Sequence, residues 1–96
     1  MRVSNHKSVT ISSASSGVLL DQNMRRKEIV FSPPAANAYE INFLGPAVLG
    51  GGIRIAAGTQ PLRLTERDMG ETIHNRIDAI SEGANVTVGI TEFLDT

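Results

Sequence analysis

Short runs in which apolar and polar residues alternate recur along this chain, and they constrain its fold more than any other feature. In one run, Tyr39, Ile41 and Phe43 are separated by single polar residues. This period of two places every second side chain on one face, which is typical of a β-strand with one buried side. The same alternation, rich in residues that favour strands, occurs at Val9 and Ile11, Ile29 and Phe31, Ile53 and Ile55, Leu62 and Leu64, and Val86, Val88 and Ile90.

Turn-forming residues separate these runs at short intervals. Pro33 and Pro34 close one run, because each proline restricts φ and lacks a backbone donor. Glycine, proline and asparagine separate other runs, at 45–46, 50–52, 58–61 and 83–85. Short strands with a turn signal every eight to twelve residues or so predict an all-β domain. We expect a small antiparallel β-sandwich or barrel over residues 17–96.

One segment has the features of a helix. Thr65 to Asp68 resembles an N-terminal capping box with Asp in place of Glu, and Gly70 is placed to end the helix. We therefore predict one short helical turn near residues 65–70. Residues 71–80 are ambiguous, because their isoleucines fit a helix or a strand, and we favour a strand from about Arg76 to Ser81.

The first 16 residues hold few large apolar side chains, among them Val9 and Ile11. We interpret this segment as an extended N-terminal arm or a peripheral strand. It would pair within the domain or with a neighbouring copy, and Val9 and Ile11 are candidate interface residues.

The chain of 96 residues has room for one domain, and a domain of this size has a thin core. It contains no cysteine, so neither disulfides nor thiolate metal sites supplement that core. Oligomerisation is the remaining common way to stabilise so small a domain.

The charge is almost balanced, with nine Lys and Arg against ten Asp and Glu. Binding to nucleic acid or to an anionic membrane would favour a basic excess, so we expect neither as a partner. The N-terminal residues lack the apolar stretch of a secretory signal, and no apolar run reaches the roughly 18 residues of a membrane span. We expect a protein made soluble in a cytoplasm.

The sequence offers little that is typical of catalysis. In a helix, Glu71 and Asp78 would share a face with His74, and three such groups are what a zinc site needs. One histidine with two carboxylates is also common on solvated surfaces, and we favour that interpretation. Gly50–Gly52 lacks the Lys-Ser/Thr pair of a phosphate loop and is typical of a hairpin loop or a bulge. We therefore predict no catalytic, cofactor-binding or metal site, and no enzyme.

One basic cluster stands out, formed by Arg25, Arg26 and Lys27. Solvated charge at the start of a strand is one interpretation, because it would protect a sheet edge. The other is an interface contact, since arginine is enriched in interfaces and grips carboxylates and carbonyls. Packaged nucleic acid is a less favoured partner, because three charges bind it weakly at physiological salt.

A series of short segments follows one order along the chain: Asn23 to Arg26, Ile29 to Pro33, Leu44-Gly45, Gly52 to Gly58, Pro61 to Thr65, Ile77 to Ile80 and Val86 to Glu92. The order of these segments resembles that of the small β-sandwich proteins encoded among the structural genes of tailed bacteriophages. The resemblance covers about residues 22–93, and the longer Ser-rich N-terminus departs from the family pattern.

The resemblance implies a virion structural protein made in the host cytoplasm. It implies a capsid decoration or cement protein, bound in many copies to the major capsid protein or another virion protein. It also implies a homo-oligomer, for which we favour a trimer. Asn23, Arg25 or Arg26, and Glu92 match recurring polar positions of the family, where they would pair with one another across the sandwich and have a purely structural role. The alternatives are a fibre-base or receptor-attachment module and, with less support, a cupin-like ligand-binding barrel.

Overall fold

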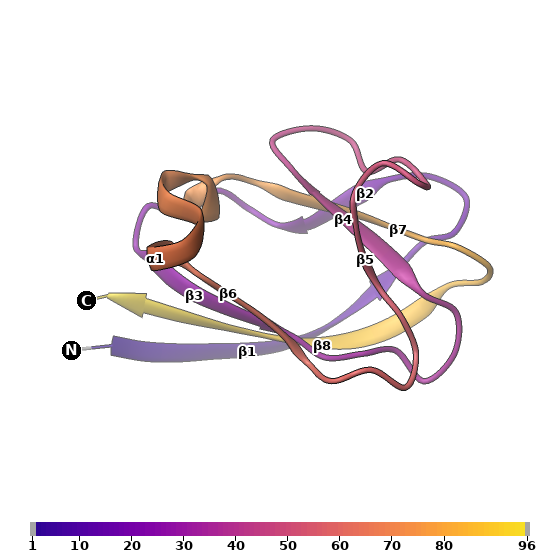
Figure 1. The fold of residues 1–96 in the computed structure, drawn as a ribbon, viewed down its shortest axis with the longest axis horizontal. Helices are drawn as coiled ribbons and strands as arrows, with labels where there is room; N and C mark the ends of the chain where they lie inside the picture. Colours follow the sequence, from indigo (N-terminus) through magenta and orange to yellow (C-terminus); the bar gives the residue numbers. More distant parts are fainter. Residues whose placement is uncertain (1, 96) are drawn as a thin grey trace.

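The computed structural model describes residues 2–95 and contains two four-stranded antiparallel sheets (Figure 1). The predicted all-β fold class is confirmed, and the two sheets make the domain a sandwich. The elements in chain order are β1 (Arg2–Ile11), β2 (Gly17–Leu20), β3 (Arg26–Phe31), β4 (Tyr39–Phe43), β5 (Ile53–Ile55), β6 (Leu62–Thr65), α1 (Glu66–Met69), the 3₁₀ turn η1 (Gly70–His74), β7 (Ile77–Ser81) and β8 (Val86–Asp95).

The strand order shows how the chain wraps into this sandwich. One sheet has the order β1-β8-β3-β6 and the other β2-β7-β4-β5. Each strand of the first half pairs with its counterpart from the second half, β1 with β8, β2 with β7, β3 with β6 and β4 with β5. The chain therefore behaves as one long hairpin that is rolled around the core, which is the jelly-roll arrangement.

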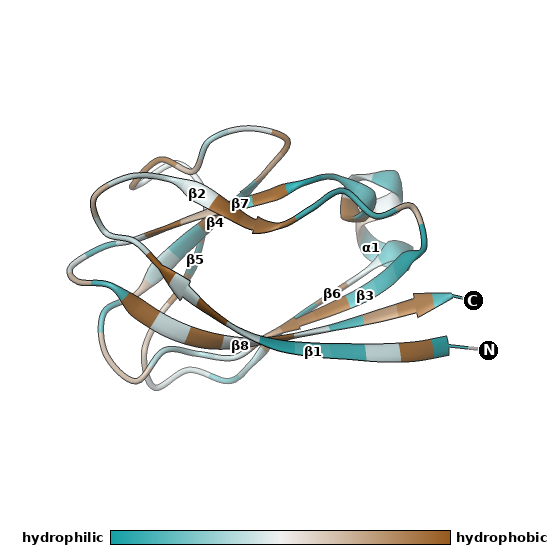
Figure 2. Ribbon diagram, turned by 180° about the vertical axis from the view of Figure 1, so that it is seen from behind, coloured by the Kyte–Doolittle hydropathy of each residue, from teal (hydrophilic) through white to brown (hydrophobic). Residues whose placement is uncertain are grey.

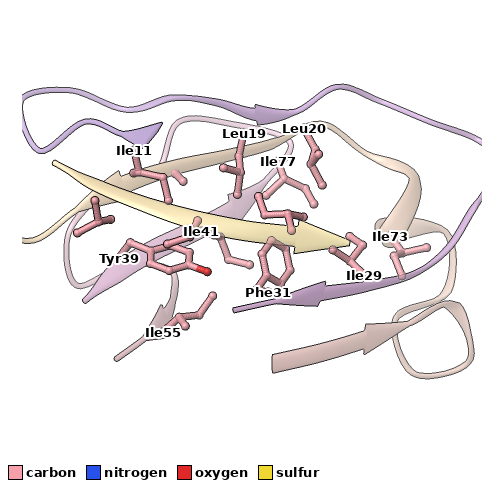
Figure 3. Close-up of a cluster of buried hydrophobic side chains, with 14 residues drawn as sticks. Ile11, Leu19, Leu20, Ile29, Phe31, Tyr39, Ile41, Ile55, Ile73 and Ile77 are labelled. Atoms are coloured by element: carbon pink, nitrogen blue, oxygen red, sulfur yellow. The ribbon is translucent and has the colours of Figure 1, made fainter. Parts of the chain in front are cut away.

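The core lies between the two sheets and consists largely of the residues that the alternation predicts. Figure 3 shows Tyr39, Ile41 and Phe31 pointing into this cluster, and none of the three has measurable exposed surface. Figure 2 shows the alternation of apolar and polar residues along β8. Burial raises the pKa of the Tyr39 phenol, whose hydroxyl donates a hydrogen bond to the Ser32 carbonyl oxygen at 3.0 Å.

The predicted helical turn and the strand that follows it are both present. Thr65 caps α1 by accepting a hydrogen bond from the Asp68 amide at 3.3 Å. Gly70 ends α1 with a φ of 63°, a backbone conformation that glycine adopts without strain. Residues 70–74 then form η1 in place of a longer α-helix, so Glu71 and His74 do not share an α-helical face with Asp78 in β7.

The N-terminal segment is an edge strand and not a free arm. Its residues 2–11 pair with β8 over the full length of β1, without a break in register. Ile11 is 3% exposed and belongs to the core, and Val9 packs against the core from the edge. Ile11 therefore holds the segment to the domain and is not available to a partner. The sequence pattern also missed β2 (Gly17–Leu20), because its two buried residues, Leu19 and Leu20, are adjacent and do not alternate with polar residues.

Candidate interaction surfaces

Arg26 lies inside the protein, so its interpretation as a surface contact has to be corrected. It is 1% exposed, and its Nε donates to the Glu92 carboxylate at 2.8 Å. Its remaining nitrogens donate to three backbone carbonyl oxygens, those of Ile73 at 2.9 Å, Asn75 at 3.0 Å and Asp21 at 2.6 Å. A buried guanidinium needs this many acceptors to compensate for its lost hydration.

The polar positions that carry the family resemblance gather around this guanidinium. Asn23 accepts a hydrogen bond from the Arg25 amide at 2.9 Å through its side chain, and its own amide donates to the His74 carbonyl at 2.9 Å. Glu92, 5% exposed, is the ion-pair partner of Arg26. These residues join the loop before β3, the segment after η1 and β8. We call this arrangement of Asn23, Arg26 and Glu92 the clamp, because its hydrogen bonds hold these three segments together.

Arg25 and Lys27 flank Arg26, and their side chains reach solvent. The Arg25 Nε donates to the Asp95 carbonyl oxygen at 2.6 Å, which ties the end of β8 to the start of β3. The Lys27 Nζ lies 3.0 Å from a Glu66 carboxylate oxygen and 3.7 Å from one of Asp95. Of the five sequence-predicted interface residues, these two and the half-buried Val9 have side-chain surface that a partner can reach.

Glu66 links Lys27 to His74 at the start of α1. The His74 Nε2 lies 2.8 Å from the same Glu66 oxygen that receives the Lys27 ammonium. The hydrogen bond from Lys27, and next the one from His74, lower the pKa of Glu66, and the bond to Glu66 raises the pKa of Lys27. His74 therefore contacts Glu66. Sequence spacing could not show this contact, because Glu66 and His74 meet only through the bend between α1 and η1. The interpretation of His74 and Asp78 as part of a solvated polar face is wrong, because the two residues are 8% and 6% exposed.

The surface beside this cluster is a shallow groove with mixed charge. It is lined by Arg2, Lys27, Arg63 and Arg67 together with Glu28, Glu66 and Asp68. Within residues 2–95, no group of three or more His, Asp or Glu side chains is placed to hold a metal ion. No helix in the same range is long and apolar enough to cross a membrane.

The loop of residues 44–52, between β4 and β5, folds back over the outer face of its sheet (top of Figure 1). Alternation along β4 turns Glu40 away from the core and under this loop. The Glu40 carboxylate accepts hydrogen bonds from the Gly50 amide at 2.9 Å and more weakly from the Gly52 amide at 3.4 Å. Asn42 donates to the Pro46 carbonyl at 3.1 Å.

A further contact fixes the middle of the loop. The Ala47 amide donates to the Ser16 hydroxyl at 2.8 Å, and Ala47 is itself 4% exposed. These polar anchors hold the loop at both ends and at its centre. The loop is therefore a positioned surface element, although it contains no regular secondary structure.

The same loop presents large apolar side chains to solvent. Leu44 is 71% exposed, Val48 62% and Leu49 48%, and Ile53 follows at the start of β5 with 38%. Exposed apolar groups that gather on one element mark an interaction site more often than isolated ones do. The sequence pattern indicated a glycine-rich hairpin here, which is correct. It gave no special role to Val48 and Leu49, although their position between Pro46 and Gly50 sets them outside any strand.

No protein-family model matches the chain, and no curated protein matches its sequence.

Proposed function

We propose that this protein is a virion structural protein, a capsid decoration or cement protein that binds the major capsid protein in many copies. The observation that carries the proposal is the anchored apolar loop 44–52. A surface whose apolar groups are held in place before binding loses little conformational entropy when a partner covers it. Such a surface is suited to a protein that binds in many copies to the equivalent sites of a capsid shell.

The fold is compatible with this role and does not decide it. Jelly rolls occur in viral capsid proteins, lectins and cupins, so function has to be argued from sites. A cupin-like ligand site needs metal ligands that converge in the barrel. Here His6 lies on the exposed edge strand β1, and His74 is bound to Glu66 beside α1. The apolar loop therefore favours binding to a protein partner over binding of a small ligand inside a barrel.

The resemblance to phage structural proteins adds support from a different part of the molecule. Its polar positions, Asn23, Arg26 and Glu92, form the clamp that ties β3 to β8. Residues that hold one fold together are expected to recur in proteins that share that fold. Contacts with the shell would then fall on surfaces outside the clamp, as loop 44–52 does.

The proposal is tested by binding to purified shells assembled from the major capsid protein. Burying one Val or Leu side chain stabilises a complex by about 1.5–3 kcal/mol, and each 1.4 kcal/mol or so is tenfold in affinity. We therefore expect Val48→Asp and Leu49→Asp each to weaken binding at least tenfold or so. Met24→Asp is the matched control, because Met24 is 64% exposed and lies outside the loop. Co-sedimentation with shells and circular dichroism of each variant give the two readouts.

Two results would contradict the proposal. One is the absence of this chain from purified particles, measured by quantitative mass spectrometry against the major capsid protein. The other is full shell binding by both loop variants. A stable trimer that binds host cells and not shells would instead support the fibre-base or receptor-attachment module.

A further inference from the structure

The four sheet edges of this sandwich are protected to very different degrees. The edge strand β5 has three residues, and β2 has four residues and a break in its register. The edge strand β6 has four residues, follows Pro61 and leads directly into α1. Short strands, irregularities, proline and charged side chains are the usual ways in which proteins prevent pairing at an edge. Of these the edge strand β1 has only the charges of Arg2 and Lys7, and it runs for ten residues in unbroken register with β8.

The register shows which backbone groups of β1 point to the open edge. The Ser32 amide donates to the Gly89 carbonyl oxygen, so Gly89 and the other odd residues of β8 face β3. The even residues of β8 therefore face β1, where their partners are odd-numbered, as Ile90 with Lys7 shows. The amides and carbonyls of Ser4 and the other even residues of β1 consequently point away from the sheet. The even-numbered Ser12, just after β1, follows the same rule: its carbonyl oxygen points away from β8 and accepts a hydrogen bond from the Ser81 amide of β7.

We propose that β1 pairs antiparallel with β1 of a second copy, about a two-fold axis at His6. Hydrogen-bonded pairs across the edge must join even residues, since only these have free groups. An axis at Lys7 would place two ammonium groups directly opposite each other, which is unfavourable. An axis at Asn5 would place Val3 opposite the partner's Lys7. An axis at His6 places Val3 opposite the partner's Val9 and Lys7 opposite the partner's Asn5.

The arrangement about His6 covers apolar surface that is otherwise exposed. Val3 is 39% exposed and pairs with Leu94 on its own sheet, and Val9 pairs with Val88. Joining the two copies would form one apolar row across the seam, Leu94 and Val3 from one copy with the partner's Val9 and Val88. On the opposite face, Ser4 would lie beside the partner's Ser8, where small side chains leave room for close approach. The inference goes beyond the proposed function and does not depend on it.

Cysteine crosslinking tests the axis directly, because the chain contains no cysteine of its own. Directly opposed residues of a hydrogen-bonded antiparallel pair have Cα atoms about 5.5 Å apart, which a disulfide can span. Two copies of residue 4 would be displaced by four residues, or about 13 Å along the strand, which a disulfide cannot span. We expect His6→Cys to form disulfide-linked dimers at least tenfold faster than Ser4→Cys under mild oxidation. Equal rates for the two variants would overturn the proposal.

A proline variant tests the pairing without crosslinking. The Ser4 amide points to the open edge, so Ser4→Pro removes a donor that the folded monomer does not use. We expect the wild-type protein to form dimers in analytical ultracentrifugation as its concentration rises into the micromolar range or above, since one added strand is a small interface. Ser4→Pro should remain monomeric with an unchanged thermal midpoint.

Two outcomes of these measurements would overturn the pairing. One is a wild-type protein that remains monomeric at every concentration, with no His6→Cys dimer. The other is an oligomer that Ser4→Pro leaves intact, because the copies would then meet at a different surface. If Ser4→Pro fails to fold, the crosslinking rates still decide the question. Shell binding is measured separately, so failure of one proposal does not imply failure of the other.

Discussion

Replacing Arg26 by methionine is the most informative perturbation of this fold. Methionine is flexible and apolar and fills a similar space, so the substitution removes the guanidinium while leaving little cavity. It leaves the Glu92 carboxylate, 5% exposed, without its ion-pair partner. It also leaves the carbonyls of Ile73, Asn75 and Asp21 without the donor that joins them. The loss therefore falls on three separate segments of the chain at once.

The expected cost is large compared with the stability of the domain. Removing one partner of a buried ion pair costs about 3–5 kcal/mol. A domain of this length is stable by about 5–14 kcal/mol in total, and each kcal/mol lowers the midpoint of a domain this size by about 4–8 °C. We expect Arg26→Met to lower the thermal midpoint by at least 12 °C or so, measured by circular dichroism and by urea unfolding.

A double-mutant cycle separates the ion pair from the carbonyl contacts. In Arg26→Met with Glu92→Leu, no unpaired charge is buried, so the double variant should be more stable than Arg26→Met alone. Arg25→Met is the matched control, because Arg25 is exposed and makes one side-chain bond to a backbone carbonyl. Its cost should be below about 1 kcal/mol. A cost below about 1 kcal/mol for Arg26→Met itself would refute the clamp.

Two further variants test the polar cluster at α1 and the loop anchor. The pKa of Glu66 is lowered from its ordinary value of 4.5 by Lys27 and His74, so the stability it contributes is complete above pH 4.5 and is lost as the pH falls through the lower, folded-state pKa. Urea midpoints measured from about pH 6 to pH 3 should therefore fall less steeply for Glu66→Gln than for the wild type. A Cβ at Gly52 would overlap the Ile41 carbonyl oxygen, whereas one at Gly51 has ordinary contacts. Gly52→Ala should cost about 1–3 kcal/mol and Gly51→Ala much less, and equal urea midpoints for the two would contradict the packing of this loop.

Most strands could be predicted from the sequence, because the alternation within a strand is enough to identify its buried face. The alternation at Tyr39, Ile41 and Phe43 needs no knowledge of the partner strand, and neither does the cap at Thr65. The strand β2 was missed because its Leu19 and Leu20 are both buried, although they are adjacent. A register break between β2 and β7 at this point explains the lost alternation.

The interaction surfaces could be predicted only in part, because they depend on contacts between distant segments. In the sequence Arg26 is one of three similar basic residues. Its burial depends on an ion pair with Glu92, which lies 66 positions later. Val48 and Leu49 belong to a loop that Glu40 anchors through the Gly50 amide. The alternation along β4 showed only that Glu40 faces away from the core. Local pattern thus determines which face a residue occupies, whereas its partner is determined by the way the jelly roll closes.

The two proposed surfaces lie on different sheets, and this has a consequence for how they would act together. The edge strand β1 belongs to the sheet with β8, whereas loop 44–52 covers the outer face of the sheet with β4. Neither surface uses a residue of the other, so pairing through β1 leaves the loop of each copy free. A paired protein would carry two apolar loops, and once one is bound the second acts at a high effective concentration. Loss of pairing in Ser4→Pro should therefore weaken binding to an assembled shell more than binding to an isolated capsid subunit. Equal weakening on both would show that β1 itself contacts the shell.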